Sequence, residues 1–374
     1  MTALAIVFWA ASGLILYTHL GYPLVLGALA RRRPPAAPRL APDPPPRVSL
    51  IVAAHDEEDG IVRFLRSALA LRYPRERLEV IVVSDGSTDR TAEWAARAGA
   101  DRVVEMPRGG KVAALNAGVE EASGEVLAFA DANAAWEPDA LARLVERLAD
   151  PAVGYVCGQV RLDAGSGENQ EGLYWRYEMA IRAIESRFAG VTGGNGAINA
   201  LRREAYIALE PTRGQDISLP FELTKRGWRA VYESAAAARE TAASTLGAEF
   251  SRKRRMLTGA WAALLRHGML SPRGYPPAYA FEIYSHRLLR YLAPVLHLIA
   301  LGTNVALVAM GAEPLYDVTL GLQLALLAAA ALAPLVPARP LLIARYYVGV
   351  CAAGLLALYD CLRGNVPTTW EKAR

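Results

Sequence analysis

Cysteine and histidine are scarce in this sequence, which has three cysteines and five histidines in 374 residues. The cysteines, Cys157, Cys351 and Cys361, are odd in number and lack the close spacing of metal ligands. Two of them lie in long apolar segments. We therefore expect neither a disulfide framework nor a cysteine-based zinc site.

A phosphate-binding run of the form Gly-x-x-x-x-Gly-Lys-Ser/Thr is also missing, and charges inside the apolar segments are few. Both absences argue against an ATP-driven transporter. The net charge is only +4, with a pI near 8.9. Its lysines and arginines cluster beside apolar segments, where anionic lipid headgroups explain them better than nucleic acid does.

The amino-terminal stretch from Thr2 to Ala30 contains no charged residue. It exceeds the roughly 20 apolar residues that span a bilayer. Arg31, Arg32 and Arg33 follow at once, whereas a cleavable signal has its positive charge first. This pattern predicts a retained anchor with the amino terminus outside and the rest of the chain in the cytoplasm.

Three further apolar runs lie near the carboxyl terminus, at Tyr291–Ala312, Val318–Ala338 and Leu341–Leu362, and the last is interrupted by Arg345 and Asp360. One anchor and three later spans would leave the carboxyl terminus outside. The basic residues of the tail favour the inside. One late segment would then lie in the interface, and the one with Arg345 is the first candidate.

These boundaries divide the chain into six expected regions. They are an anchor at 1–30, a proline-rich linker at 31–47, a cytoplasmic domain at 48–250, an interfacial amphipathic region at 251–287, about three membrane segments at 288–364, and a tail at 365–374. Two amphipathic stretches, 168–188 and 257–270, fit the membrane face, although core packing is an equal alternative for the first. Histidines inside the spans, His19 and His297, fit helix-packing hydrogen bonds.

The cytoplasmic region alternates between β-rich and helical patterns. We expect strands at Val48–Ala54, Leu78–Ser84 and Val126–Ala130, and helices at Glu58–Leu71, Thr88–Ala98 and Lys111–Ala122. The strands are continuously apolar, which is typical of parallel strands covered on both faces. The fold class predicted is α/β, with a mostly parallel sheet flanked by transmembrane helices.

Acidic residues follow each predicted strand, at Asp56–Glu58, Asp85 and Asp131. The carboxyl ends of parallel strands meet at one edge of the sheet, where ligands bind. If the chain stays extended after Asp131, that side chain and Asn133 point the same way and can face one hard cation. The alternative is that both residues only cap the following turn.

Several motifs in this order and spacing resemble one enzyme family. VSLIVAAHDEE, VIVVSDGSTDRT, GGKVAALNAG and FADANAAW resemble the nucleotide-sugar-binding half of the family 2 glycosyltransferases, and GGNGAINALRR, GQD and FSRKRRMLTGAW resemble their acceptor half. The resemblance covers about Val48 to Trp261. With the flanking spans it is similar to the membrane-bound polysaccharide synthase branch, such as cellulose, chitin and hyaluronan synthases, and implies a GT-A-like domain.

The resemblance implies a donor site for a UDP-sugar. The residues expected to hold its uracil and ribose are Ala54, Asp56, Glu57 and Asp85, since carboxylates accept hydrogen bonds from ring N–H groups and ribose hydroxyls. Lys111 is expected beside the nucleotide or sugar, with a solvated lysine as the alternative.

The metal-binding Asp-x-Asp of the family falls on Asp131 and Asn133. The ion implied is Mg²⁺ or Mn²⁺, which would neutralise the departing diphosphate. Asn133 departs from the pattern because its amide oxygen can ligate but carries no charge.

Asp216 falls where the family has its catalytic base, and Gln215 replaces the acid that usually precedes it. One carboxylate suffices to take a proton from an acceptor hydroxyl. The alternative is an N-cap for a helix over Ile217–Lys225. The glycine-rich turn at 193–196 would let the backbone approach the sugar or acceptor closely.

The family's Gln-x-x-Arg-Trp maps onto residues 252–256. Arg255 keeps the arginine expected to meet the diphosphate, whereas Arg252 replaces the glutamine and Met256 the tryptophan. The loss of the aromatic removes a platform for stacking the acceptor sugar, unless Trp261 serves instead.

We therefore expect an inverting glycosyltransferase that moves a sugar from a UDP-sugar to a growing polysaccharide at the cytoplasmic face of the cell membrane. One alternative adds a single sugar to a lipid-linked acceptor. The other is a nucleotide-sugar-binding subunit with little catalysis. The expected partners are the donor, a glycan or lipid-linked acceptor and the bilayer, with a homo-oligomer or export partner conceivable.

Overall fold

The structure is a computed structural model that describes residues 1–33, 42–163, 170–241 and 246–367. The linker predicted at 31–47 and the tail predicted at 365–374 therefore lie partly outside the described residues. The soluble part is built on one sheet of eight strands, in the order β3-β2-β1-β4-β7-β6-β8-β5. The strands are β1 Val48–Ala54, β2 Leu78–Asp85, β3 Arg102–Met106, β4 Val126–Asp131, β5 Ala135–Trp136, β6 Val153–Asp163, β7 Ile198–Arg202 and β8 Arg229–Thr241.

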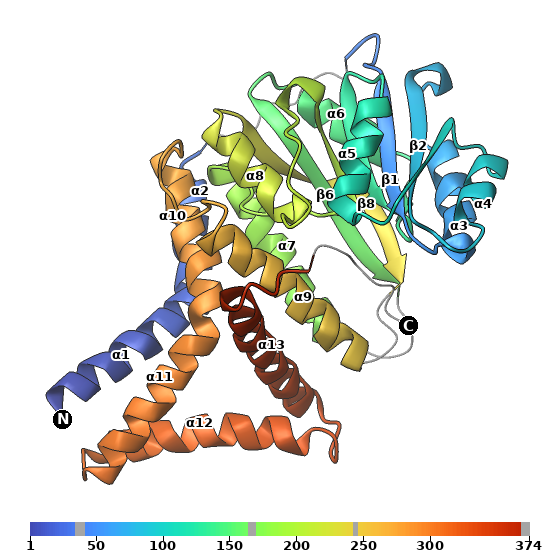
Figure 1. Ribbon diagram of the computed structural model, residues 1–374. Helices are drawn as coiled ribbons and strands as arrows, with labels where there is room; N and C mark the ends of the chain where they lie inside the picture. The colour runs from blue at the N-terminus through green and yellow to red at the C-terminus, as the bar shows by residue number, and fades with distance from the viewer. Residues whose placement is uncertain (34–41, 164–169, 242–245, 368–374) are drawn as a thin grey trace.

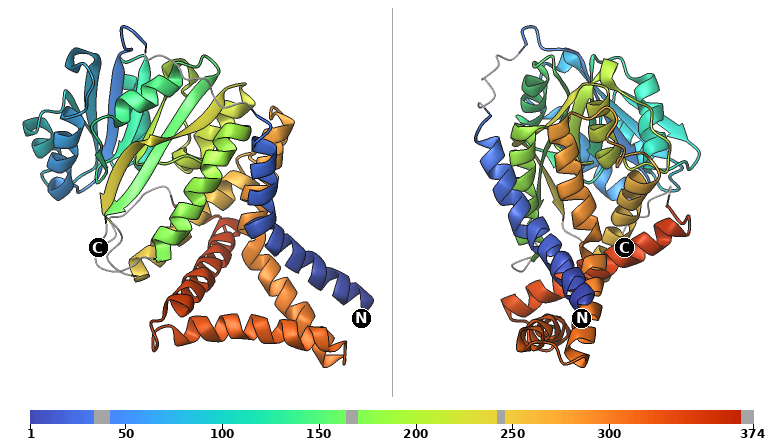
Figure 2. Two further views of the ribbon diagram at one scale, coloured as in Figure 1. Left: turned by 180° about the vertical axis from the view of Figure 1, so that it is seen from behind. Right: turned by 90° about the vertical axis from the view of Figure 1, so that its left-hand side faces the viewer.

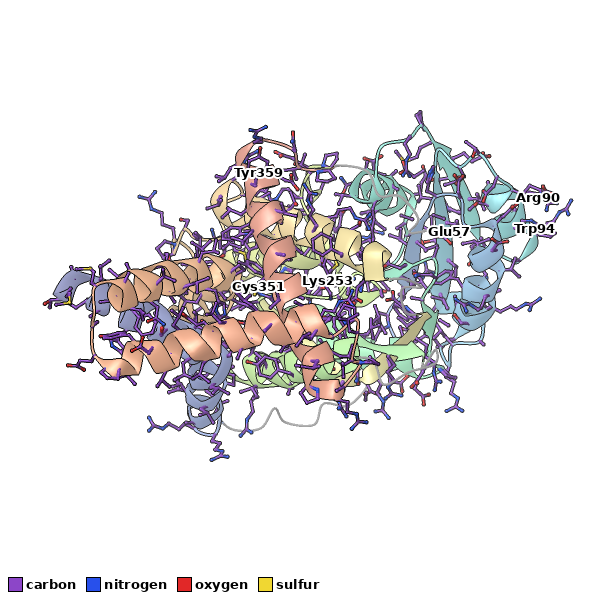
Figure 3. All side chains as sticks on the ribbon, turned by 90° about the horizontal axis from the view of Figure 1, so that it is seen from below. Glu57, Arg90, Trp94, Lys253, Cys351 and Tyr359 are labelled. Atoms are coloured by element: carbon purple, nitrogen blue, oxygen red, sulfur yellow. The ribbon has the colours of Figure 1, made fainter. Side chains whose placement is uncertain are left out.

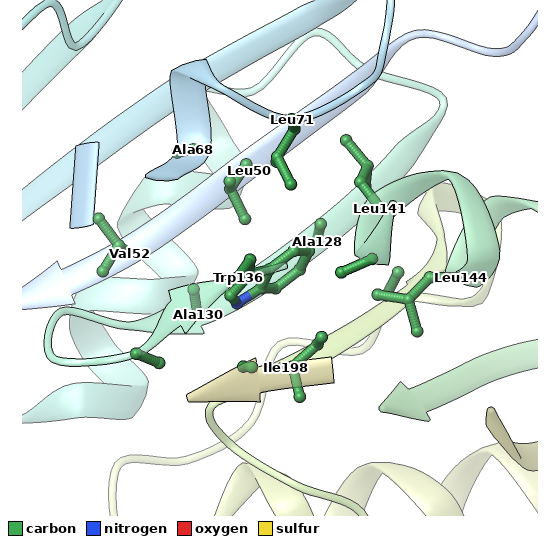
Figure 4. Close-up of a cluster of buried hydrophobic side chains, with 14 of the residues drawn as sticks. Leu50, Val52, Ala68, Leu71, Ala128, Ala130, Trp136, Leu141, Leu144 and Ile198 are labelled. Atoms are coloured by element: carbon green, nitrogen blue, oxygen red, sulfur yellow. The ribbon is translucent and has the colours of Figure 1, made fainter. Parts of the chain in front are cut away.

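Helices cover both faces of this sheet (Figure 1). On one face lie α3 Glu58–Leu69, α4 Thr91–Arg97 and α6 Ala140–Leu148, and on the other α5 Lys111–Glu121, α7 Gln170–Phe188 and α8 Gln215–Lys225. Successive residues of β1 alternate between the two cores: Leu50 and Val52 face α3 and α6, whereas Ile51 faces α5. Figure 4 shows the first core, where Trp136 packs beside Ala128 and Ala130.

Half of the sheet matches the sequence-based prediction. Strands β1, β2 and β4 are parallel neighbours within a residue of their predicted bounds, and the α/β class is confirmed. The other half was not predicted: there β7 runs antiparallel to both β4 and β6. The sheet is thus mixed.

Four helices of the described chain are long and apolar enough to cross a membrane: Thr2–Ala30, Pro277–Ala309, Pro314–Leu332 and Arg339–Leu362. The first comprises α1 Thr2–Leu16, a π-helical turn at Tyr17–Gly21 and α2 Tyr22–Ala30. The second comprises α10 Pro277–Glu282, a π-helical turn at Ile283–Leu288 and α11 Leu289–Ala309; the others are α12 and α13. The second helix therefore begins well before the run predicted at 291–312.

The arrangement of the carboxyl-terminal helices bears on which of them could lie along a membrane interface. In Figures 1 and 2, α11 leads away from the domain that contains the sheet, α12 runs across the far ends, and α13 leads back. Asn304 of α11 is fully buried, and its amide lies 3.0 Å from both Thr319 Oγ1 and Gln323 Oε1 of α12. The transverse segment is thus α12, not the segment with Arg345.

Helix α9, Leu246–Leu265, packs against α13 and connects it to the domain that contains the sheet. Arg254 donates to both carboxylate oxygens of Asp360, at 2.6 and 2.8 Å, which accounts for an acidic residue in an apolar helix. Viewed from below in Figure 3, Lys253 of α9 lies beside α13, whereas Glu57 lies far across the molecule. Trp261 is only 2% exposed, and its indole N–H points to the carbonyl of Gly354 at 3.3 Å.

Two polar networks fasten the long apolar helices. Tyr347 Oη of α13 lies 2.7 Å from His297 Nε2 and 3.1 Å from His19 Nε2, which confirms helix-packing roles for both histidines. Nearer the domain, Glu185 of α7 accepts from the Tyr22 hydroxyl at 2.8 Å and lies 2.7 Å from His286 Nδ1. Helix α7 therefore packs between the sheet and α2, as in the core-packing alternative.

Candidate functional site

Asp85, at the end of β2, is fully buried and organises the loop that follows β3. Its carboxylate accepts from Arg108 Nη1 at 2.8 Å, from the Gly109 N–H at 2.6 Å and from the Gly110 N–H at 3.0 Å. Gly110 has φ of 92°, a conformation that favours glycine. Asp85 thus fixes the loop that leads into α5, whose first residue is Lys111. In the structure Asp85 supports this loop and lies behind the residues predicted to contact the donor.

Lys111 and Asp131 form the centre of the site. The ammonium of Lys111 donates to the carboxylate of Asp131 at the tip of β4, and both side chains are 31% exposed. Burial would lower the pKa of Lys111, but Asp131, and then Asp216 and Glu240, raise it above its usual value. Of these three carboxylates, Asp131 contacts the ammonium directly.

Gly196 lies directly against this pair. A Cβ added there would sit 2.9 Å from Lys111 Nζ and 3.6 Å from an Asp131 carboxylate oxygen. The glycine-rich turn predicted at 193–196 therefore approaches the acidic strand tip closely, and it does so between α7 and β7.

The structure corrects the geometry assumed for Asp131 and Asn133. The chain turns right after β4, and the Ala134 N–H donates to the Asp131 carbonyl at 3.0 Å, so the segment is not extended. Asn133 is exposed at this turn. That both residues bind metal stays a prediction.

The oxygens available fit a cation that is shared with substrate. Within the described residues no cluster of three or more His, Cys, Asp or Glu side chains could hold a metal. Mg²⁺ commonly takes one or two protein carboxylates together with substrate phosphates. Asp131 is accessible and Asn133 adjoins it, so these two residues suit that mode, and the ion would supply positive charge for a diphosphate.

Asp216 lies in the first turn of α8, which starts at Gln215 rather than at Ile217. Gly214 is the N-cap of this helix, and no side chain caps it in the described structure. The N-cap alternative for Asp216 is therefore wrong. The Gly194 N–H donates to the Asp216 carbonyl at 2.6 Å, so the glycine-rich turn also holds the proposed base.

The loop after β1 carries the other predicted donor residues. Ala54 is fully buried, and Asp56 has a φ of 52°. The Asp56 carboxylate accepts from the Thr88 N–H at 2.8 Å, which lowers its pKa. The Glu57 N–H donates to the Thr91 hydroxyl at 2.8 Å. These bonds join the loops after β1 and β2, and direct contact with a nucleotide stays a prediction.

Arg255 and Met256 belong to α9 and not to the sheet. Arg255 is partly buried, and Met256 is half exposed. Trp261, the suggested substitute platform, is closed in by Tyr291 at a ring-centroid distance of 6.1 Å. Trp261 therefore cannot stack a sugar, and that suggestion was wrong.

Sequence reasoning missed Arg108, which pairs with Asp85, and Glu240, whose charge helps to raise the pKa of Lys111. Arg108 stands beside the GGK run, and its pairing with Asp85 could not be foreseen without knowing that the loop folds back onto β2. Glu240 lies near the end of β8, whose alanine-rich sequence gives no strand alternation.

The part of the chain that carries this site matches the model of a known protein family. The family model described as "Glycosyl transferase family 2" matches residues 49–209, which include β1, the Lys111–Asp131 pair and the glycine-rich turn. Residues 49–209 form a family 2 glycosyltransferase domain. The catalytic-base candidate Asp216 lies just beyond the matched range of this glycosyltransferase domain.

Curated relatives of the chain differ in what they make. Poly-beta-1,6-N-acetyl-D-glucosamine synthase of Staphylococcus aureus is 28% identical over 59% of this chain and 56% of the relative. Beta-monoglucosyldiacylglycerol synthase of Synechocystis is 29% identical over 67% of this chain and 56% of the relative. The chain spans a little over half the length of these relatives.

One solved structure resembles the chain nearly end to end. The mannosyltransferase PcManGT of Pyrobaculum calidifontis, in complex with GDP-Man and Mn²⁺, is 26% identical with a TM-score of 0.72. The match covers 95% of this chain and 99% of that one. The GT-A-like fold predicted for the domain is thus supported together with the flanking helices.

Proposed function

We propose that the chain transfers a sugar from a nucleoside diphosphate sugar to an acceptor hydroxyl at the cytoplasmic face of a membrane. The observation that carries this proposal is the convergence of Asp131, Lys111 and Asp216 around the glycine-rich turn, in a domain of family 2. The relatives named above support a nucleotide-sugar donor, and their GDP-linked example leaves the base open between uracil and guanine.

Each residue has a role in the proposed reaction. Asp216 takes the proton of the acceptor hydroxyl, whose oxygen forms a bond to the anomeric carbon as the bond to the diphosphate oxygen breaks. Lys111 moves from Asp131 to the leaving diphosphate. Asp131 and Asn133 would hold a divalent cation, which would supply further positive charge for that group. Attack opposite the leaving group inverts the anomeric centre.

The acceptor has two candidate classes. A single sugar transferred to a membrane lipid is favoured by the open arrangement of the helices: between 6% and 28% of each apolar window is buried in the described structure. These spans therefore enclose little space for a polymer. Similarity to the poly-N-acetylglucosamine synthase favours a growing polysaccharide instead, which would need a second copy or a partner to complete an exit path.

The helix arrangement supports a specific topology. With the amino terminus outside, α1–α2 enters, α11 leaves, α12 lies along the outer interface and α13 returns. This leaves the carboxyl terminus inside, as the basic tail requires.

The test is release of nucleoside diphosphate by the full chain in lipid discs, over UDP- and GDP-linked sugars, with Mn²⁺, Mg²⁺ or chelator. We expect metal-dependent release with one donor. A single sugar on lipid supports the first acceptor class and a ladder of products the second. Donor binding without release under every condition would contradict an enzyme.

A further inference from the structure

Arg287 is a buried arginine of a long apolar helix, and the proposed chemistry does not use it. It lies in the π-helical turn at Ile283–Leu288 and is 8% exposed. The helix Pro277–Ala309 has 33 residues, whereas about 20 suffice to cross a bilayer. Its first turns pack on the domain that contains the sheet, where the Tyr279 hydroxyl donates to the Val191 carbonyl at 3.0 Å. Arg287 thus lies at the junction of helix and domain.

The guanidinium of Arg287 reaches the start of the glycine-rich turn at 193–196. Its Nε donates to the Thr192 hydroxyl oxygen at 2.8 Å, and its Nη1 lies 3.4 Å from the Tyr291 hydroxyl. A Cβ added to Gly193 would lie 2.9 Å from Cζ of Arg287, and closer still to Nη2. The guanidinium therefore lies directly against the backbone of the turn, an approach that a side chain at Gly193 would obstruct.

Thr192 links the charge of Arg287 to a buried carboxylate. Its hydroxyl accepts from Arg287 and donates to the carboxylate of Glu185 on α7, at 3.1 Å. Glu185 is 1% exposed and also binds the two partners from the apolar helices described above. The neighbouring carboxylate of α7, Glu178, pairs with Arg290. Arg287 is therefore held in one orientation by a hydroxyl that is itself fixed by an anion.

The glycine-rich turn carries this contact on to the proposed site. Its first glycine faces the long helix, as described. The N–H of Gly194 donates to the carbonyl of Asp216 at 2.6 Å. Gly196 lies against the Lys111–Asp131 pair. One short segment thus connects the long helix with the proposed base and with the acid proposed to hold the metal.

We propose that Arg287 is a positioning residue that holds the glycine-rich turn, and through it Asp216, in place for sugar transfer. The effect on transfer rests on the proposed function, whereas the hold on the turn does not. A shift of a reacting group by about 1 Å can cost on the order of 100-fold in rate. Because Arg287 belongs to the long apolar helix, full turnover requires that helix to be packed on the domain.

The first test measures kcat and donor affinity of the full chain in lipid discs, for Arg287→Met and the control Arg273→Met. Arg273 is exposed just before the same helix. We expect kcat of Arg287→Met to fall about tenfold while donor affinity stays within about twofold of wild type, and Arg273→Met to match wild type. Wild-type kcat in Arg287→Met would overturn the proposal. So would a donor affinity that falls as far as kcat does.

Thr192 offers a matched pair of variants that leave Arg287 in place. Thr192→Val removes the hydroxyl that accepts from Arg287, whereas Thr192→Ser keeps it. We expect kcat about tenfold lower in Thr192→Val and within about twofold of wild type in Thr192→Ser. Adding Arg287→Met to Thr192→Val should cost little more, because both changes break one contact. Equal kcat in the valine and serine variants would overturn the proposal, and this pair decides the matter if Arg287→Met does not fold.

The second test does not depend on transfer. Hydrogen exchange of the backbone amides at 191–196 is followed by mass spectrometry in the same discs, where the bond from Gly194 to Asp216 protects one of them. We expect exchange about tenfold faster in Arg287→Met and Thr192→Val than in wild type, and unchanged in Arg273→Met. Unchanged exchange in Arg287→Met would overturn its hold on the turn. If wild type transfers no sugar from any donor, the proposed function fails, while the exchange rates still test Arg287.

Discussion

Replacing Lys111 by methionine should strengthen metal binding and weaken donor binding at the same site. In the structure the Lys111 ammonium neutralises Asp131, the proposed metal ligand. A unit charge about 5 Å from a divalent ion costs on the order of 6 kcal/mol at an effective dielectric constant of about 20. The side chains are 31% exposed and the lysine can swing aside, so we reduce this to about 1.4 kcal/mol.

That free energy predicts Mn²⁺ affinity about tenfold higher in Lys111→Met without nucleotide. With Mn²⁺ saturating, the same variant should bind the nucleoside diphosphate about tenfold more weakly, because the diphosphate loses its ammonium partner. Electron paramagnetic resonance of free Mn²⁺ measures the first quantity and calorimetry the second. Lys225→Met, on the far end of α8, is the matched control. Unchanged or weaker Mn²⁺ binding in Lys111→Met would refute the reasoning.

Three further outcomes follow from the contacts. Gly196→Ala should keep its melting temperature but lose about tenfold in turnover, because the new Cβ, 2.9 Å from Nζ, displaces only the end of Lys111. Burial would raise the pKa of Glu185, but His286 and Arg287 lower that pKa below 4.5 overall. The ionised carboxylate therefore stabilises the fold above pH 4.5, and this stabilisation is lost as the pH falls further. The melting temperature of wild type, but not of Glu185→Gln, should drop in that acidic range. Asp360→Asn should speed amide hydrogen exchange in α9, because it breaks the two-bond contact with Arg254.

Each of these outcomes has a control. Gly259→Ala adds a Cβ to α9 with no neighbour within 4 Å and should leave turnover unchanged. If Gly196→Ala unfolds the chain, or Glu185→Gln shows the same acid response as wild type, the corresponding contact does not act as described. For Asp360→Asn, unchanged exchange in α9 would mean that packing alone holds the helix on α13.

The sequence predicted the parallel half of the sheet because buried parallel strands are continuous apolar runs. β1 and β4 are such runs, and their acidic ends indicated the site. The antiparallel half escaped prediction because β8 is rich in alanine, which favours helix over strand. The effect of Glu240 on the pKa of Lys111 could not be foreseen for that reason.

The sequence indicated the strand ends and loops that carry the candidate residues, but not the contacts among them. Asp216 precedes a helical pattern, and only the helix start at Gln215 shows that its carboxylate does not cap. The turn after Asp131 was invisible because alanine and asparagine suit turns and strand ends alike.

The central claim, that Asp216 is the base of a sugar transfer, is tested most directly by Asp216→Asn in the full chain. With the donor identified, transfer and donor binding are measured on the same preparation. We predict donor and Mn²⁺ binding within about twofold of wild type, with transfer reduced at least 100-fold, as expected when a general base is lost. Transfer within a few-fold of wild type would contradict the account.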